Sequence, residues 1–123
     1  MTAIPALVLL SGSVALGLLL GLEYLRRVRS KPAVIGFHLL FGAASVEVMA
    51  MLIRGTPDGG IAPTGWMLKA ATGLLAFALL SGLVTPMVGR QSRATMNGAL
   101  IIHVAAAASG VVLSLVWFVR AVQ

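Results

Sequence analysis

The chain has 123 residues, of which 59% are hydrophobic and 10% are charged, and its formal net charge is +6. A soluble domain carries about a quarter charged residues, so this composition excludes a soluble domain and indicates a membrane protein. The chain contains no cysteine, which excludes disulfides, iron–sulfur clusters and thiolate ligation of a metal.

Four apolar runs, at about 3–25, 33–53, 66–88 and 95–119, reach the roughly 20 residues that a helix needs to cross a bilayer. We therefore expect an all-α fold, a membrane four-helix bundle that forms a single transmembrane domain over residues 1–123. The first run lacks the positively charged start of a signal peptide, so we count it as a helix. Little chain is left outside the membrane, and any chemistry is expected within the bundle or at its ends.

The first run has Pro5 near its first turn and closes on Tyr24 beside three arginines, an ending that is typical of a membrane interface. Within this run, Ser13, Gly17 and Gly21 recur every four residues and form one stripe of small side chains. Such a stripe favours close packing against a neighbouring helix. The same face is also a candidate wall of a pocket.

The second run starts after Ser30, which we expect to be its N-cap, with Pro32 at a position where the missing N–H is harmless. The run ends at Arg54 and Gly55. The following segment 56–65, TPDGGIAPTG, is rich in Gly and Pro and is predicted to be a short connection.

The third run opens with Trp66 at the interface and with Lys69, whose long side chain can reach out of the membrane. Thr85 and Pro86 predict a bend or the end of this helix. The fourth run ends near Arg120.

Basic residues are distributed unequally between the two ends of the predicted helices. Those that follow the first and third runs are Arg26, Arg27, Arg29, Lys31, Arg90 and Arg93. Those at the opposite ends are Arg54, Lys69 and Arg120. Because basic residues concentrate in cytoplasmic loops, we expect the first group to face the cytoplasm and both termini to lie on the non-cytoplasmic side. Clustering at helix ends also argues against a nucleic-acid partner.

The two halves of the chain resemble each other when His38 is aligned with His103. Arg54 follows His38 by 16 residues, and Arg120 follows His103 by 17. Each histidine is preceded by a glycine-containing helix and a basic loop. We therefore expect two helical hairpins that form a parallel repeat, related by a pseudo-two-fold axis along the membrane normal.

The chain has no histidines other than these two. His38 lies seven residues after Lys31 and His103 ten residues after Arg93, which is about 10 Å and 15 Å along parallel helices. The second and fourth helices of a bundle lie diagonally across its core, so two inward imidazoles at similar depth are expected to hold one metal ion. Iron in haem b is the natural occupant, with both histidines as axial ligands.

A haem also needs space around its edge and partners for its propionates. Small residues fall at the depth of the histidines on every helix: Gly17, Gly21, Gly42, Ser81, Gly82, Ala99 and Ala107. Lys31, Arg90 and Arg93 lie toward the nearer surface and are candidates for charge-assisted contacts with the propionates.

Other interpretations of the polar residues stay open. Each histidine is also a candidate for a hydrogen bond between helices or for a proton path. Zinc or copper is disfavoured, because two histidines leave a tetrahedral site incomplete and Glu47, nine residues after His38, points half a turn away. Glu47 itself fits a structural ion pair with Arg54 or Lys69, a subunit contact, or a proton or quinone site.

The arrangement resembles the four-helix core of membrane b-type cytochromes, especially the cytochrome b of quinol–cytochrome c oxidoreductases. In that family, histidines on the second and fourth helices ligate haem b, and glycines on the first and third helices make room for it. The matching residues here are His38, His103, Gly17, Gly21 and Gly82. The family carries a second histidine about four turns further along each ligand helix. At those positions this chain has Met51 or Leu52, and Val116 or Trp117.

The resemblance therefore implies one haem b rather than two. It implies a small membrane b-type cytochrome that moves one electron at a time, as a carrier or as a subunit of a membrane redox complex rather than as a stand-alone enzyme. Its expected partners are the lipid bilayer and other membrane redox subunits or a second copy, and a quinone is a further candidate. We expect it in the inner or plasma membrane of a prokaryote.

Three alternative functions follow from the same residues. The first is an accessory subunit of a larger membrane complex that carries no cofactor. The second is a small dimeric transporter that uses Glu47. The third is a protein that binds one chlorophyll-type pigment on each histidine.

Overall fold

The computed structural model describes residues 4–55 and 65–122. Within these residues it contains four helices and no strand. The helices are α1 (Ile4–Leu25), α2 (Pro32–Gly55), α3 (Gly65–Val88) and α4 (Arg93–Val122). Each is long and apolar enough to cross a membrane, so the prediction of an all-α chain with four helices of membrane-spanning length is confirmed. The connection predicted over 56–65 lies outside the described residues, apart from Gly65, which begins α3.

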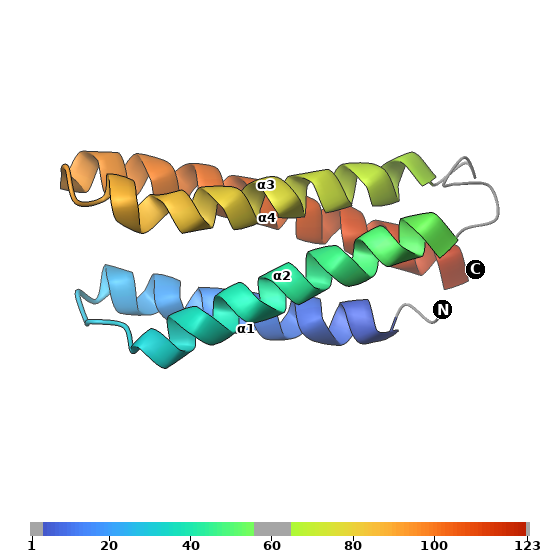
Figure 1. Ribbon diagram of the computed structural model, residues 1–123, viewed down its shortest axis with the longest axis horizontal. Helices are drawn as coiled ribbons and strands as arrows, with labels where there is room; N and C mark the ends of the chain where they lie inside the picture. Colours follow the sequence, from blue (N-terminus) through green and yellow to red (C-terminus); the bar gives the residue numbers. More distant parts are fainter. Residues whose placement is uncertain (1–3, 56–64, 123) are drawn as a thin grey trace. The chain divides into compact units, whose positions relative to one another are not determined.

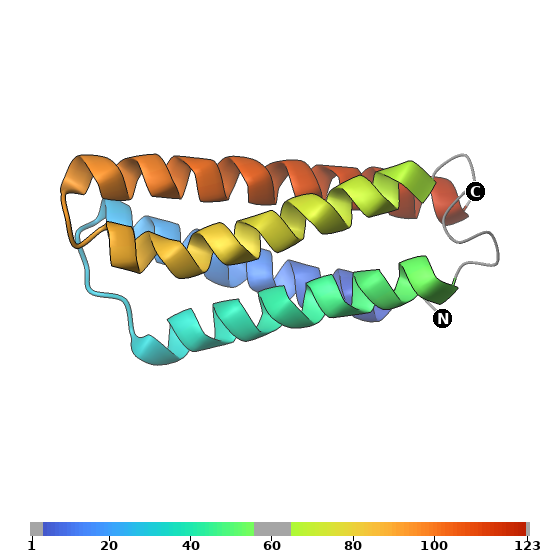
Figure 2. The same cartoon turned by 45° about the horizontal axis from the view of Figure 1, so that its top comes forward.

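The helices form two antiparallel hairpins, α1 with α2 and α3 with α4 (Figure 1 and Figure 2). By their contacts, the residues divide into two compact units, Met1–Val48 and Met49–Gln123. The last turns of α2 therefore belong to the second unit. In that unit, the hydroxyl oxygen of Ser114 on α4 lies 3.7 Å from the sulfur of Met49, and both side chains are fully buried.

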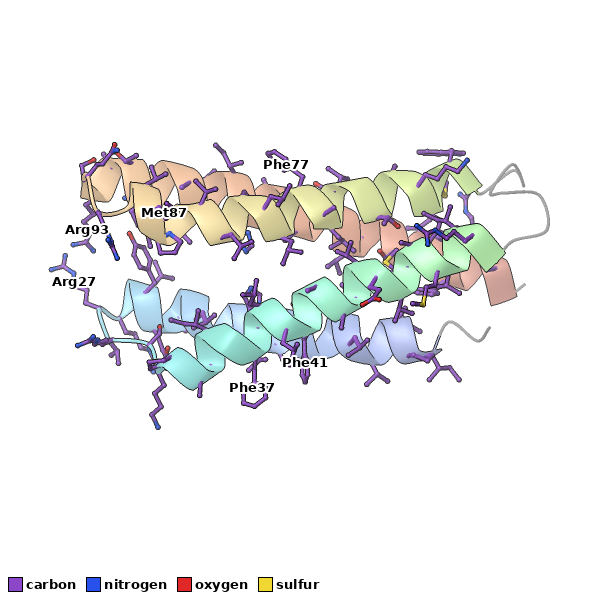
Figure 3. All side chains as sticks on the ribbon, in the orientation of Figure 1. Arg27, Phe37, Phe41, Phe77, Met87 and Arg93 are labelled. Carbon is purple, nitrogen blue, oxygen red and sulfur yellow. The ribbon has the colours of Figure 1, made fainter. Side chains whose placement is uncertain are left out.

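A Schellman motif ends α1. The backbone N–H of Val28 donates to the carbonyl of Glu23 (2.9 Å), and the N–H of Arg27 donates to the carbonyl of Tyr24 (3.1 Å). This geometry places Arg27 in the left-handed region, with φ 59°, a position that glycine normally occupies. Arg27 lies in the short turn before α2 (Figure 3).

We predict that Arg27→Gly stabilises the protein by about 0.5 kcal/mol, because glycine removes the Cβ clash of the left-handed conformation but costs more entropy on folding. Thermal unfolding in detergent measures the effect. Arg26→Gly is the matched control, since it removes the same charge from a neighbour without a positive φ. A gain in Arg26→Gly as large as that in Arg27→Gly would contradict the conformational explanation.

The starts of α2 and α4 are capped differently. The N–H groups of Val34 and Ile35 donate to the carbonyl of Lys31 (3.0 and 3.3 Å), so the cap residue of α2 is Lys31 and the prediction of Ser30 was wrong. Pro32 then occupies the first helical position, where its fixed φ suits the helix. At α4, the side-chain oxygen of Ser92 accepts the N–H of Thr95 (3.1 Å). This cap explains why α4 begins before the predicted residue 95.

Pro86 lies inside the last turn of α3, which continues to Val88. Proline lacks the N–H that would bond the carbonyl of Gly82, four residues earlier. The hydroxyl of Thr85 donates to the adjacent carbonyl, that of Ser81 (2.8 Å). The helix therefore passes through Pro86 and ends two residues later, close to the predicted position.

Close contacts between helices define the packing inside each hairpin. A Cβ atom built at Gly12 on α1 would lie 2.7 Å from Cδ2 of Phe41 on α2. One built at Gly110 on α4 would lie 2.8 Å from Cγ of Leu75 on α3. Both distances are too short for a real Cβ, so neither position accepts a side chain without movement of its neighbour. Phe41 also contacts Phe37 on its own helix, with ring centroids 6.3 Å apart (Figure 3).

The two hairpins bury equivalent positions, offset by 65 residues. The buried residues of α1 are Ala6, Leu10 and Ser13, and their equivalents in α3 are Ala71, Leu75 and Ala78, which are also buried. Ser45 and Met49 on α2 are buried, as are their equivalents Gly110 and Ser114 on α4. One packing pattern therefore occurs twice in the chain.

Candidate functional site

His38 lies in the interface between α1 and α2. Its ring nitrogen Nδ1 lies 2.9 Å from the backbone carbonyl oxygen of Ser13, 25 residues earlier. The ring packs against the backbone of Gly17, one turn further along α1. A Cβ built at Gly17 would lie 3.0 Å from Cε1 of His38, a tight contact that a side chain could make only with a small shift of the ring.

His103 lies in the same way between α3 and α4. Its Nδ1 lies 2.8 Å from the carbonyl oxygen of Ala78, again 25 residues earlier. A Cβ built at Gly82 would lie 2.9 Å from Cε1 and 3.0 Å from Nδ1 of His103. Gly82 therefore has the same relation to His103 that Gly17 has to His38.

The two histidine sites are copies of one arrangement. Each has a histidine on the second helix of its hairpin, a carbonyl on the first helix, and a glycine four residues after that carbonyl. The three members of the second site follow those of the first by 65 residues: Ser13 and Ala78, Gly17 and Gly82, His38 and His103. Both rings are half-buried.

The hydrogen bond to a carbonyl determines which ring nitrogen carries the proton. A carbonyl oxygen can only accept, so Nδ1 of each histidine must be the donor. In a neutral imidazole, the lone pair then resides on Nε2. This is the usual state of a histidine that ligates a metal, which donates its other N–H to a carbonyl or carboxylate that fixes the ring. Each hairpin thus orients one imidazole through Nδ1, with the lone pair on Nε2.

The hairpins differ in the hydroxyl groups near the carbonyl. Ser81 donates its hydroxyl proton to the Ala78 carbonyl (2.9 Å), so this oxygen accepts from both Ser81 and His103. The Ser81 oxygen is also 3.5 Å from Nδ1 of His103. The equivalent residue in the first hairpin, 65 positions earlier, is Leu16, which has no hydroxyl group to donate.

The other residues predicted to surround a haem differ in how exposed they are. Gly21 faces open space, since a Cβ built there would meet no atom within 4 Å. Gly42 on α2, and Ala99 and Ala107 on α4, are half-buried. Exposed basic residues at the helix connections include three that were predicted to contact propionates: Lys31, Arg90 and Arg93 (Figure 3 labels Arg93).

Glu47 is exposed on α2, and Arg54 and Lys69 are exposed as well. Within the described part of the chain, no ion pair joins Glu47 to either of these two residues. The interpretation of Glu47 as half of such a structural ion pair is therefore not supported. A carboxylate exposed on a membrane-spanning helix is energetically unfavourable in lipid.

The carbonyl acceptors at Ser13 and Ala78 are the functional groups that sequence reasoning missed. A backbone carbonyl is present at every residue, so it has no signature of its own in the sequence. A usable signal was the repeated spacing: a glycine precedes each histidine by 21 residues, at Gly17 and Gly82.

The fold and these sites define the class of the protein, a multi-pass helical membrane protein in which each of two hairpins orients one histidine. No protein-family model, curated protein sequence or solved structure matches the chain. Among the residues that the structure describes, no three His, Asp or Glu side chains are grouped so that they could hold a metal ion.

Proposed function

We propose that the protein is a membrane b-type cytochrome in which His38 and His103 are the two axial ligands of a single haem b. The observation that carries this proposal is the duplicated hydrogen bond from Nδ1 to a carbonyl, 2.9 Å at His38 and 2.8 Å at His103. With Nδ1 donating to a carbonyl, Nε2 is the proposed ligating atom in both rings. Two copies of the same ring-orienting hydrogen bond fit a cofactor that takes one equivalent ligand from each hairpin.

The chain's donors fit haem better than a free metal ion. The porphyrin supplies four nitrogen ligands, so iron needs only two from the protein, whereas structural zinc needs four. When bound, haem supplies reversible one-electron chemistry, and the protein tunes its potential through ligation, hydrogen bonding and burial. Lys31, Arg90 and Arg93 are the proposed partners of the propionates.

The proposal requires both hairpins to belong to one transmembrane domain, as a parallel repeat around a pseudo-two-fold axis. Met49 and Ser114 are equivalent positions of this repeat, and their side chains lie 3.7 Å apart within the second unit.

The proposed topology follows the distribution of basic residues, which places the turns after α1 and α3 in the cytoplasm and both termini on the opposite side. The proposed location is the inner or plasma membrane of a prokaryote. The exposed Glu47 supports a protein neighbour on that face of α2, either another membrane redox subunit or a second copy, because lipid alone is a poor environment for a carboxylate. A quinone is a proposed electron partner.

Visible spectra of the purified protein test the proposal. We expect the protein, expressed with sufficient haem and purified in mild detergent, to show the sharp α and Soret bands of low-spin b-type haem after reduction with dithionite. A colourless protein would contradict the proposal that this protein is a cytochrome. An accessory subunit without cofactor would then be the better assignment, and the histidines would serve only as hydrogen-bonded links within each hairpin.

A further inference from the structure

We infer that Ser81 is a positioning residue that makes the two histidine ligands electronically unequal and raises the reduction potential of the bound haem. The inference rests on the proposed function, because it concerns the same histidines. It arises from a difference between the duplicated sites, the Ser81 hydroxyl that donates to the Ala78 carbonyl.

The geometry places two donors on one acceptor. The Ala78 carbonyl oxygen accepts the Nδ1–H of His103 at 2.8 Å and the hydroxyl of Ser81 at 2.9 Å. The Ser81 oxygen is 3.5 Å from Nδ1, which is too long for a strong hydrogen bond. The main effect of Ser81 on the ring is therefore exerted through the shared carbonyl.

A carbonyl oxygen that accepts two hydrogen bonds divides its electron density between them, so each bond is weaker than it would be alone. A weaker bond to Nδ1–H leaves the imidazole less electron-rich at Nε2, because the hydrogen bond to the second nitrogen raises ligand basicity. A less electron-rich axial ligand stabilises ferric iron less. Ser81 should therefore raise the reduction potential, and its loss should lower it.

The first hairpin provides the matched position for a reciprocal test. Leu16 stands where the second hairpin has Ser81, and the Ser13 carbonyl stands three residues before it. A serine at position 16 can donate to that carbonyl in the same way that Ser81 donates to Ala78. Leu16→Ser should therefore weaken the hydrogen bond of His38 and raise the potential.

A control for general effects of removing a hydroxyl lies in the same helix. Thr72 donates its hydroxyl to the carbonyl of Leu68 (2.8 Å), whereas the carbonyls beside Nδ1 of the two histidines are those of Ser13 and Ala78. Thr72→Ala removes one side-chain hydrogen bond to the α3 backbone, as Ser81→Ala does. It should leave the potential unchanged.

The experiment combines a potentiometric titration of the haem with proton NMR of the ring Nδ1–H groups in the reduced, diamagnetic protein. We expect Ser81→Ala to lower the potential, with a change of about two- to threefold in the reduction equilibrium constant, a fraction of the worth of one hydrogen bond. The Nδ1–H resonance of His103 should move downfield, and that of His38 should stay in place. Leu16→Ser should do the opposite at His38.

Suppose that Ser81→Ala still shows the haem spectrum but changes neither the reduction potential nor the His103 resonance. That result would overturn the role of Ser81 and leave the proposed function standing. An equal shift in Thr72→Ala would also overturn it, because the effect would then be general to the helix. A protein without a haem spectrum would reject the proposed function itself, and the tuning role with it.

Discussion

Replacing either His38 or His103 with alanine is expected to abolish the reduced low-spin haem spectrum. One haem with two axial histidines loses six-coordination when either ligand is removed. We expect the α band to fall about tenfold or more in each single variant, since even changes in the groups that support a ligand reduce affinity by about tenfold to a hundredfold. Difference spectra of equal amounts of purified protein provide the measurement.

The same variants distinguish one shared cofactor from separate pigments. If each histidine bound its own pigment, each single variant would keep about half of the absorbance, and only the double variant would lose all of it. Glu47→Gln is the control, because Glu47 is an exposed residue of α2 and should keep the full spectrum. Retention of an unaltered low-spin spectrum in His38→Ala or His103→Ala would contradict axial ligation by that residue.

Adding a methyl group at Gly82 is expected to have the second-largest effect. The new Cβ would lie 2.9 Å from Cε1 of His103, so the ring must move away from the Ala78 carbonyl. Gly73 in the same helix faces open space, and Gly73→Ala keeps the gain in helix propensity without the clash. We expect Gly82→Ala to be about 1–3 kcal/mol less stable than Gly73→Ala, measured by denaturation in mixed detergent.

The first hairpin should behave in the same way but more mildly. A Cβ at Gly17 would lie 3.0 Å from Cε1 of His38, a contact that a small shift can relieve. Gly36, which faces open space on α2, is the matched position there. If Gly82→Ala and Gly73→Ala had equal stability and equal haem absorbance, the missing side chain at Gly82 would not be what makes room for the His103 ring.

The lengths and order of the helices were predictable because membrane-spanning segments are long, continuous and apolar. The ends of the helices were less predictable. The Ser92 cap lengthens α4 at its start, and Lys31 rather than Ser30 caps α2, because the proline that follows fixes where the first helical bond forms.

The candidate site was predictable only in part. The rarity and spacing of the histidines indicated that His38 and His103 are equivalent. The hydrogen bonds of the two rings could not be predicted in this way. The sequence suggested that Gly17 and Gly82 leave room for a haem, whereas in the fold both pack directly against the imidazole of their own hairpin. A pattern of small residues indicates that space is needed at a given depth in the membrane. It does not report which group fills the space, because that depends on the rotation of each helix about its axis.

Each imidazole is oriented by groups of its own hairpin, 25 residues back along the chain. During synthesis, His38 can therefore adopt its final orientation once α1 and α2 have entered the bilayer, before α3 has emerged from the ribosome. Under the proposed function, a haem would then meet two rings that are each already oriented. An oriented ring loses less conformational entropy on binding than a freely rotating side chain does, so the proposed haem is expected to enter after each hairpin has formed.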